Sequence, residues 1–389
     1  MTTLAWFIFA FILLQFAVAI VNLIFSQRFP QSNSGFNNLV SVLIPARNEE
    51  KKITNLLNDL ISHDYQNIEI LIFNDQSTDK TAEIVSGFAQ KDARVKLINS
   101  KGLPEGWLGK NHACHSLSKL ANGRYLLFLD SDVRIGNGII RQTCAFSEKH
   151  KLGLLSIFPR QIMDTAGEKA AVPLMHFILL TLLPLILVRK TGFSSLAAAN
   201  GQFMLFNSDI YRKTFPHEKM KNDKVEDIKI ARYFKNGGIK IACITGKESV
   251  SCRMYSGFLE SVHGFSKNVT QFFGNSFSLA ILFWLVTTFG FIVVFWALPK
   301  TILISYFIIF ILTRITVSIA AKQSVFMNLI FLIPQQLALG LFVLKAAVNR
   351  YKNQYEWKGR NISYTDFIYF QRIGCDGDLQ NRNLQGVHQ

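Results

Sequence analysis

The sequence predicts an α/β fold, a parallel sheet covered by helices, with membrane-spanning helices before and after it in the chain. From Leu39 to about Gly274, short β-branched runs alternate with segments of helical spacing. This alternation is typical of a parallel sheet, because each crossover between parallel strands requires a connecting helix. Long apolar runs occupy both ends of the chain and predict the flanking helices.

Four short apolar runs are the expected strands: VSVLIPA, IEILIFND, VKLINS and YLLFLDSD. Helical spacing lies between them in NEEKKITNLLNDLISH, which starts at Asn48, and in STDKTAEIVSGFAQKD, which starts at Ser77. Sheets of this class bind ligands at the carboxyl ends of their strands. The polar residues that follow each run are therefore the candidates for a binding site.

Segment 1–26 is expected to be a transmembrane anchor. Its core, Leu4 to Phe25, is a charge-free run of 22 residues, which at helical rise reaches roughly 33 Å. A secretory signal peptide is the alternative, but the run has no basic segment before it and no small-residue cleavage site after it. A polar linker, 27–38, leads to the α/β domain at 39–275.

Segment 276–345 is the expected C-terminal transmembrane region. It holds three apolar stretches, Phe277–Leu298, Thr301–Ala320 and Val325–Leu344, and a basic tail of cytoplasmic type follows at 346–389. Three crossings here would put this tail opposite the α/β domain, although basic flanks prefer the cytoplasm. Either one stretch is re-entrant or interfacial, or the charge rule is broken.

A further apolar stretch, 169–188, interrupts the α/β domain. A single crossing here would separate Asp132 from Asp227 by a membrane, and Pro173 and Pro184 break its helical pattern. We therefore expect it to lie in the membrane interface beside the site. A buried core helix is the alternative.

The composition limits the possible partners and cofactors. The net charge of +16 suits an anionic membrane face or a phosphorylated ligand. No helix-turn-helix, zinc-finger or RNA-recognition signature accompanies this charge, so we expect no nucleic-acid partner. The five cysteines form no C-x-x-C pair, which argues against zinc.

The first two strand ends carry candidate ligand-binding residues. Pro45, Ala46, Arg47 and Glu49 follow the first strand, although the same segment also reads as a helix start with Asn48 as its N-cap. After the second strand, a carboxylate at Asp75 suits a base or a ribose, and Asp79 suits a helix cap.

Lys110 lies in GWLGKNHA, where two glycines precede it and a helix follows. A lysine beside a helix N-terminus suits phosphate. A surface turn with a solvated lysine is the alternative. The cluster of histidines here, His112 and His115, has no third ligand at metal-site spacing.

The fourth strand ends in Asp130-Ser131-Asp132. In an extended segment both carboxylates point one way, and the apolar strand behind them provides no counter-charge. We therefore expect a divalent cation here, bridging two phosphate oxygens. A coincidental acidic pair is the alternative.

Later in the chain, Glu226 and Asp227 open a helix. Acids favour a helix N-terminus for electrostatic reasons alone, but Asp227 also suits a general base that removes a hydroxyl proton. Arg253 and Lys267 suit neutralisation of a departing diphosphate, or simply a membrane surface.

Taken in order, PARNEE, NDQSTDKT, GWLGKNHA, LDSD, NGQF, VED and RMYSGFLESVHGFSKN resemble the motifs of family 2 glycosyltransferases, which have the GT-A fold. The resemblance covers about Leu39 to Asn275. The flanking apolar segments are similar to those of the membrane-bound, lipid-modifying branch, which includes carotenoid-acid and hopanoid-associated glycosyltransferases.

The resemblance implies a role for each matching residue. A UDP-sugar would be bound by Pro45, Ala46, Arg47, Glu49, Asp75, Lys110, Asp130 and Ser131. Asp132 would hold Mg²⁺ or Mn²⁺, and Asp227 would be the base. Gly201, Gln202 and Glu226 would line the acceptor pocket, and Arg253 and Lys267 would stabilise the leaving UDP.

One departure bears on the product. Processive synthases of this family carry Q-x-x-R-W, and this chain has GFSKN in that place. This difference argues for the addition of one sugar, or a few, to a lipid. The resemblance implies inverting transfer of a hexose, glucose in the first instance, to a lipid such as a carotenoid, hopanoid or sphingolipid. The enzyme would lie in the inner, cytoplasmic membrane with its domain facing the cytoplasm. Alternatives are a polyprenyl-phosphate or polysaccharide glycosyltransferase, and a sugar-nucleotide sensor or scaffold.

Overall fold

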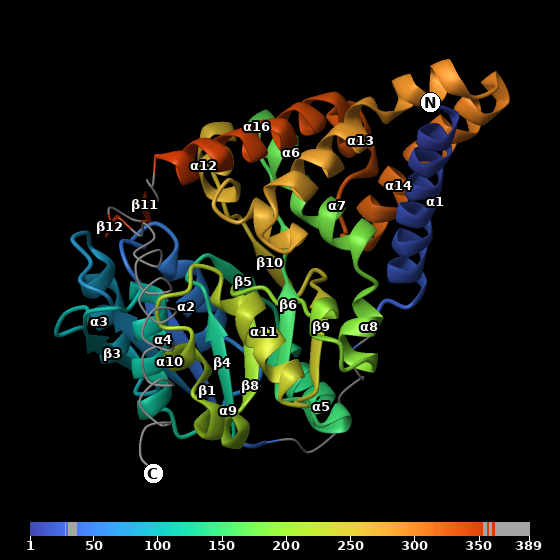
Figure 1. The fold of residues 1–389 in the computed structure, drawn as a ribbon. Helices are drawn as coiled ribbons and strands as arrows, with labels where there is room; N and C mark the ends of the chain where they lie inside the picture. Colours follow the sequence, from blue (N-terminus) through green and yellow to red (C-terminus); the bar gives the residue numbers. More distant parts are fainter. Residues whose placement is uncertain (28, 30–36, 353–355, 358–359, 362–389) are drawn as a thin grey trace, which may run out of the picture.

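The computed structural model describes residues 1–27, 29, 37–352, 356–357 and 360–361. An α/β domain carries a group of long apolar helices on one side (Figure 1). Most of the linker at 27–38 and most of the tail at 346–389 lie outside the described residues.

A seven-stranded sheet forms the centre of the α/β domain, in the order β3-β2-β1-β4-β8-β6-β9. Only β8 runs antiparallel to its neighbours, so the predicted parallel sheet is a mixed one. The strands are β1 (Val40–Ala46), β2 (Ile68–Asn74), β3 (Val95–Asn99), β4 (Tyr125–Leu129), β6 (Leu154–Phe158), β8 (Phe203–Asn207) and β9 (Ile241–Thr245).

The sheet is buried on both faces, because alternate side chains of a strand point to opposite sides. In β1, Leu43 belongs to one apolar core while Val42 and Ile44 belong to the other. The helices of the domain are α2 (Ile53–Ile61), α3 (Thr81–Lys91), α4 (Gly109–Leu120), α5 (Ile139–His150), α9 (Ser208–Thr214), α10 (Pro216–Lys219), α11 (Glu226–Asn236) and α12 (Phe258–Phe265). Two 3₁₀ turns, η1 (Ser194–Leu196) and η2 (Val269–Phe273), complete it.

A small second sheet lies beside the end of β4. Its strands are β5 (Val133–Ile135), β10 (Val250–Cys252) and β7 (Arg160–Gln161). Because β10 pairs antiparallel with β5, Cys252 lies opposite Val133. Residues after β10 are thereby brought next to Asp132. A short hairpin, β11 (Glu356–Trp357) with β12 (Arg360–Asn361), follows the helices.

Among the residues that the structure describes, four helices are long and apolar enough to cross a membrane. They are α1 (Thr2–Ile24), α13 (Phe277–Ala297), α14 (Lys300–Ala320) and α16 (Leu332–Tyr351). The predicted stretch Val325–Leu344 is not one helix, because it divides at Phe331 into α15 (Val325–Ile330) and α16.

The stretch 169–188 forms parts of α6 (Ala166–Ala171), α7 (Pro173–Leu182) and α8 (Leu185–Lys190). Most side chains of α7 are buried, and the helix packs on α1, α14 and α16. Asn22 of α1 donates to the carbonyls of Leu180 and Leu183 and accepts from the amide of Leu185, which satisfies the helix ends around Pro184. A position of this stretch in the membrane interface stays a prediction.

Candidate active site

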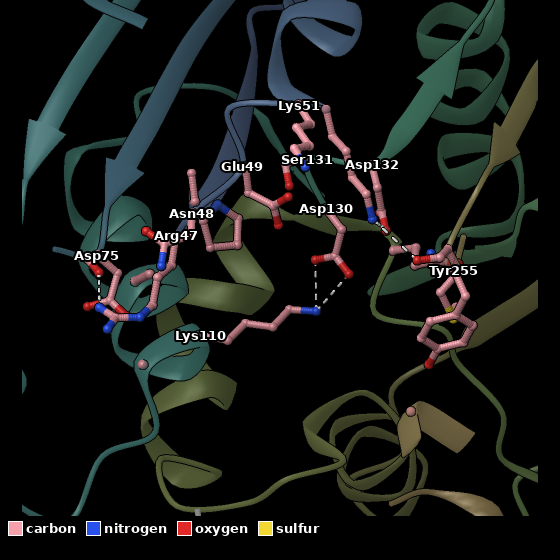
Figure 2. A pocket seen from close by; sticks show the side chains of 18 of the residues that line it. Arg47, Asn48, Glu49, Lys51, Asp75, Lys110, Asp130, Ser131, Asp132 and Tyr255 are labelled. Atoms are coloured by element: carbon pink, nitrogen blue, oxygen red, sulfur yellow. Dashed lines mark hydrogen bonds and ion pairs between the residues drawn. The ribbon is translucent and has the colours of Figure 1, made fainter. Parts of the chain in front are cut away.

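A cavity of about 680 Å³ lies at the carboxyl ends of β1, β2 and β4, where the sequence predicts a site (Figure 2). Most of the predicted site residues line it. These are Pro45, Ala46, Arg47, Glu49, Asp75, Lys110, Asp130, Ser131, Asp132, Gln202 and Lys267. Gly201, Glu226 and Asp227 lie next to the cavity, in contact with Lys110 or with each other.

The loops after β1 and β2 hold one another in place. The side-chain oxygen of Asn48 accepts from the amide of Thr78 at 2.9 Å, and the amide of Asn48 donates to Ser77 Oγ at 3.1 Å. The φ of Asn48 is +52°, a left-handed conformation typical of turns. Asn48 is therefore not an N-cap, and α2 begins only at Ile53.

One end of the cavity is formed by Arg47 and Asp75 (Figure 2). Arg47 Nη1 donates to the carbonyl of Asp75 at 2.6 Å and to that of Gln76 at 3.1 Å. Asp75 is buried at the end of β2, and its amide donates to the carbonyl of Ala46 at 2.8 Å. This end thus offers a fixed guanidinium and a carboxyl group, both suited to a polar base or a ribose.

Lys110 lies between acids from two other elements. Its Nζ is 2.8 Å from Asp130 Oδ1 and 3.4 Å from Glu226 Oε1. Burial alone would lower the pKa of Lys110, but Asp130 and Glu226 hold it well above its ordinary value. In this structure Lys110, which was predicted to bind phosphate, neutralises acidic side chains of the protein itself. Its contact with a nucleotide stays a prediction.

Asn111 positions the start of α11 opposite Lys110. This buried side chain donates through Nδ2 to the carbonyls of Met220 at 2.6 Å and Asp223 at 2.9 Å. The loop before α11 is thereby fixed to α4. Sequence reasoning missed this contact, because nothing local to Asn111 indicates a partner more than 100 residues away.

Asp227 is held by two backbone amides. Its Oδ2 accepts from the amide of Gly201 at 2.9 Å and its Oδ1 from the amide of Ile228 at 2.8 Å. Burial and the neighbouring Glu226 raise the pKa of Asp227 to about 7, while Lys110 and the two amides act in the opposite direction. A carboxyl group with this pKa is suited to proton transfer at neutral pH.

Asp132 and its neighbours form the other end of the cavity. Asp130-Ser131-Asp132 is a tight turn closed by the amide of Val133 on the carbonyl of Asp130 at 3.2 Å, so the predicted extended segment is wrong. The apolar strand behind these carboxylates supplies no counter-charge, as expected, but two lysines from other segments do. Lys52 Nζ lies 3.7 Å from Asp132 Oδ2, and Lys110 pairs with Asp130.

The surroundings of Asp132 fit a hard cation. Its buried Oδ1 has no hydrogen-bond partner among the described residues, and the same holds for Gln202 Oε1. Burial and the nearby Asp130 raise the pKa of Asp132 to about 6, although Lys52 and Cys252 act in the opposite direction. No three His, Cys, Asp or Glu side chains within the described ranges cluster closely enough to hold a metal. A cation here would therefore need further ligands, such as diphosphate oxygens.

Arg253 does not line the cavity, whereas Lys267 does. Arg253 Nη2 is 2.9 Å from the buried Glu168 Oε1, and Nη1 is 2.9 Å from Asp164 Oδ2. Glu168 also forms the capping box of α6 with Thr165. Arg253 thus fixes the start of α6, and its predicted contact with a diphosphate has no support in this geometry.

Several lining residues had no role in the sequence prediction. They include Lys52, Glu260, His263 and Gly264. Lys52 resembles any solvated lysine near a helix start, so no sequence signal marks it. The pair His263 and Lys267 does have a signal, because a spacing of four puts them on one face of a helical segment.

Comparisons with known proteins agree with this geometry. Residues 41–215 match the model of the family described as glycosyl transferase family 2. This part of the chain is a family 2 glycosyltransferase domain.

Two similar proteins are named 4,4'-diaponeurosporenoate glycosyltransferase. The one from Staphylococcus haemolyticus is 28% identical over 239 residues, which cover 59% of this chain and 60% of that protein. The one from Staphylococcus aureus strain N315 is 27% identical over 277 residues, or 68% of this chain and 71% of the relative. The match to the first thus spans less than two thirds of its length.

The solved structure of the mannosyltransferase PcManGT from Pyrobaculum calidifontis, in complex with GDP-Man and Mn²⁺, is similar in fold. The TM-score is 0.52 at 15% identity, covering 88% of this chain and 99% of that one. The predicted GT-A fold is confirmed.

Proposed function

We propose that this protein is a membrane-bound, inverting glycosyltransferase that moves a hexose, glucose in the first instance, from a UDP-sugar to a lipid. The observation that carries the proposal is the convergence of Asp132, Asp130, Lys110 and Asp227 at one end of a GT-A sheet. These residues come from three separate segments of the chain, α4, the turn after β4 and α11, which makes a coincidental acidic loop a poor explanation.

Asp227 acts as the base in this proposal. Its carboxylate takes the proton of an acceptor hydroxyl, the acceptor oxygen forms a bond to the anomeric carbon, and the bond from that carbon to the diphosphate breaks with its electron pair on the diphosphate. Attack from the side opposite the diphosphate inverts the anomeric centre. The pKa of about 7 keeps Asp227 partly ionised at neutral pH.

The negative charge that develops on the diphosphate requires cations. Lys267 lines the cavity and is suited to this task. Mg²⁺ or Mn²⁺, held by Asp132 together with the diphosphate, would supply additional neutralisation of the leaving group. Asp75 and Arg47 would hold the uridine at the other end of the cavity.

A lipid acceptor is supported by the apolar helices beside the domain and by the names of the relatives, which refer to a carotenoid acid. The domain would face the cytoplasm, where sugar nucleotides are available. A carboxylic acid acceptor is ionised at neutral pH and needs no base. Dispensability of Asp227 would therefore favour a carboxylate acceptor over a hydroxyl.

The experiment is transfer of radiolabelled glucose from UDP-glucose into a lipid extract by membranes that contain the protein, with GDP-mannose as the competing donor. We expect transfer by the wild type and a loss of at least about 100-fold in Asp132→Ala and Asp227→Asn. Asp209→Asn, an exposed acid on α9, is the matched control. Wild-type transfer by both site variants would overturn the assignment, and Mn²⁺ binding in the presence of UDP, measured by electron paramagnetic resonance, tests Asp132 separately.

A further inference from the structure

The helices next to the α/β domain differ in how far they extend from it. A separate apolar cluster of Ala5, Ile8, Ile12, Val294 and Tyr306 joins α1, α13 and α14. No residue of α15 or α16 belongs to this cluster within the described part of the chain. Three helices, and not four, therefore build the part of the bundle that is distant from the domain (Figure 1).

The buried face of α16 belongs to the main core instead. Its members are Ala338, Leu339, Phe342, Val343 and Ala346. The ring of Phe342 lies 5.3 Å from that of Phe265 on α12. Figure 1 shows α16 running along the domain above α6 and α12.

Both ends of α16 are bonded to the α/β domain. Gln335 Nε2 donates to the carbonyl of Lys169 at 3.0 Å, and Asn349 Nδ2 donates to Ser266 Oγ at 3.4 Å. These two contacts are separated by about 21 Å of helix. A helix that crosses a hydrocarbon core of about 30 Å contacts a domain on one face of the membrane near only one of its ends. The helix α16 contacts the α/β domain near both of its ends.

The direction of α16 relative to α13 also places the C-terminal end of α16 at the domain. Trp284 Nε1 of α13 donates to the carbonyl of Gln336 at 3.0 Å, and the guanidinium of Arg350 lies 5.3 Å from the ring of Phe277. Since α13 leaves the domain at Phe277, α16 runs back toward the domain and ends there.

The outer face of α16 is an exposed aliphatic stripe, which we call the α16 stripe. Its residues follow a spacing of four, four, three and four, which is one face of a helix. They are Ile333, Leu337, Leu341, Leu344 and Val348, with exposed fractions of 69, 57, 43, 61 and 37%. Exposed basic residues, Arg350 and Lys352, follow at the C-terminal end. An aliphatic face that ends in basic residues fits an anionic lipid leaflet.

We infer that the described part of the chain crosses the membrane three times, through α1, α13 and α14, and that α16 lies in the leaflet on the domain side with the α16 stripe in lipid. The C-terminal end of α16 is then on the same side as the domain, in agreement with the exposed Arg350 and Lys352 found there. The inference uses the membrane attachment of the proposed function, but not its chemistry.

The geometry also brings lipid close to the cavity. Besides α13 and α6, α16 packs on α12, and His263 and Gly264 of α12 line the cavity. A lipid that enters along α16 reaches this wall without leaving the leaflet.

Labelling with a membrane-impermeant maleimide tests the number of crossings. The background is Cys375→Ser, in which the remaining cysteines are buried. Lys91→Cys on α3 reports the domain side, Thr301→Cys the hairpin between α13 and α14, and Lys352→Cys the end of α16; all three sites are exposed. We expect Lys352→Cys to react from the same side as Lys91→Cys. Reaction from the side of Thr301→Cys would overturn the inference.

Spin labels along the α16 stripe give a second readout that does not depend on transferase activity. A spin label is placed at each of the five positions in turn. Its depth in the bilayer is obtained from its collision rate with oxygen, which is enriched in lipid, relative to its collision rate with a water-soluble nickel chelate. An in-plane helix gives similar, shallow depths at all five positions. A depth that passes through a maximum at the bilayer centre near Leu341 would show a crossing and contradict the inference.

Discussion

Lys110 Nζ and Asp130 Oδ1 form a 2.8 Å ion pair that joins the start of α4 to the end of β4, and Glu226 at the start of α11 closes the group at 3.4 Å. Three acids, Asp130, Glu226 and Asp227, thus share one cation from the protein. Such a group is stable only while the cation is present, since acids brought together raise one another's pKa.

Replacement of Lys110 by Gln should therefore affect both activity and pH dependence. Loss of the ammonium removes the main opposing charge, so the pKa of Asp227 should rise further above 7. We expect transfer at pH 7 to fall by at least about 100-fold, with partial recovery at higher pH. Lys119→Gln, an exposed site on the same helix, is the control. A uniform loss at every pH would contradict this account and indicate a purely structural role.

The wild-type pH profile should report Asp227 directly. Its pKa is raised to about 7, so below pH 7 the base is increasingly protonated and kcat/KM should fall about tenfold per pH unit. Above pH 7 the profile should be flat. Asp227→Asn should lack this rise while donor binding persists. The same shift implies that folding stability decreases as pH rises from about 4 to 7, because the native state holds this proton more tightly than the unfolded state.

Much of the site could be predicted because its residues lie at strand ends. Asp75, Asp130 and Lys110 each follow an apolar run or precede a helix, and parallel strands bring such positions together. The long apolar runs also predicted the helices α1, α13 and α14. The antiparallel β8 could not be predicted, because a lone apolar run has no direction until its neighbours are known.

What could not be predicted depends on contacts between distant segments. Arg253 pairs with Glu168 across 85 residues of sequence, and Lys52 pairs with Asp132 between the segments after β1 and after β4. The return of α16 to the domain is set by Gln335 and Asn349, two polar residues in a stretch that reads as a crossing by hydropathy. The sequence around each of these residues does not indicate its distant partner.

Gly201 lies where no side chain fits without moving Lys110. A Cβ at this position would be 2.9 Å from Lys110 Nζ and 3.3 Å from Glu226 Oε1. Because a lysine end can move, we expect Gly201→Ala to fold, but with the ion pair to Asp130 disturbed and transfer reduced by about tenfold or more. Gly192→Ala, with nothing within 4 Å, should be neutral. Wild-type kinetics in Gly201→Ala would show that the position of Lys110 is unimportant.

Substitutions of Lys267 and Arg253, the two basic residues predicted to stabilise the leaving group, should have different effects on transfer rate and UDP affinity. Lys267 lines the cavity, so Lys267→Gln should reduce transfer by about 10-fold or more and weaken binding of UDP. Arg253 is paired with Asp164 and the buried Glu168, so Arg253→Gln should instead destabilise the start of α6 by about 1–3 kcal/mol, with much smaller effects on UDP affinity. Isothermal titration with UDP and thermal unfolding in detergent measure the two effects. Equal losses of UDP affinity in both variants would mean that Arg253 turns into the cavity when the nucleotide binds.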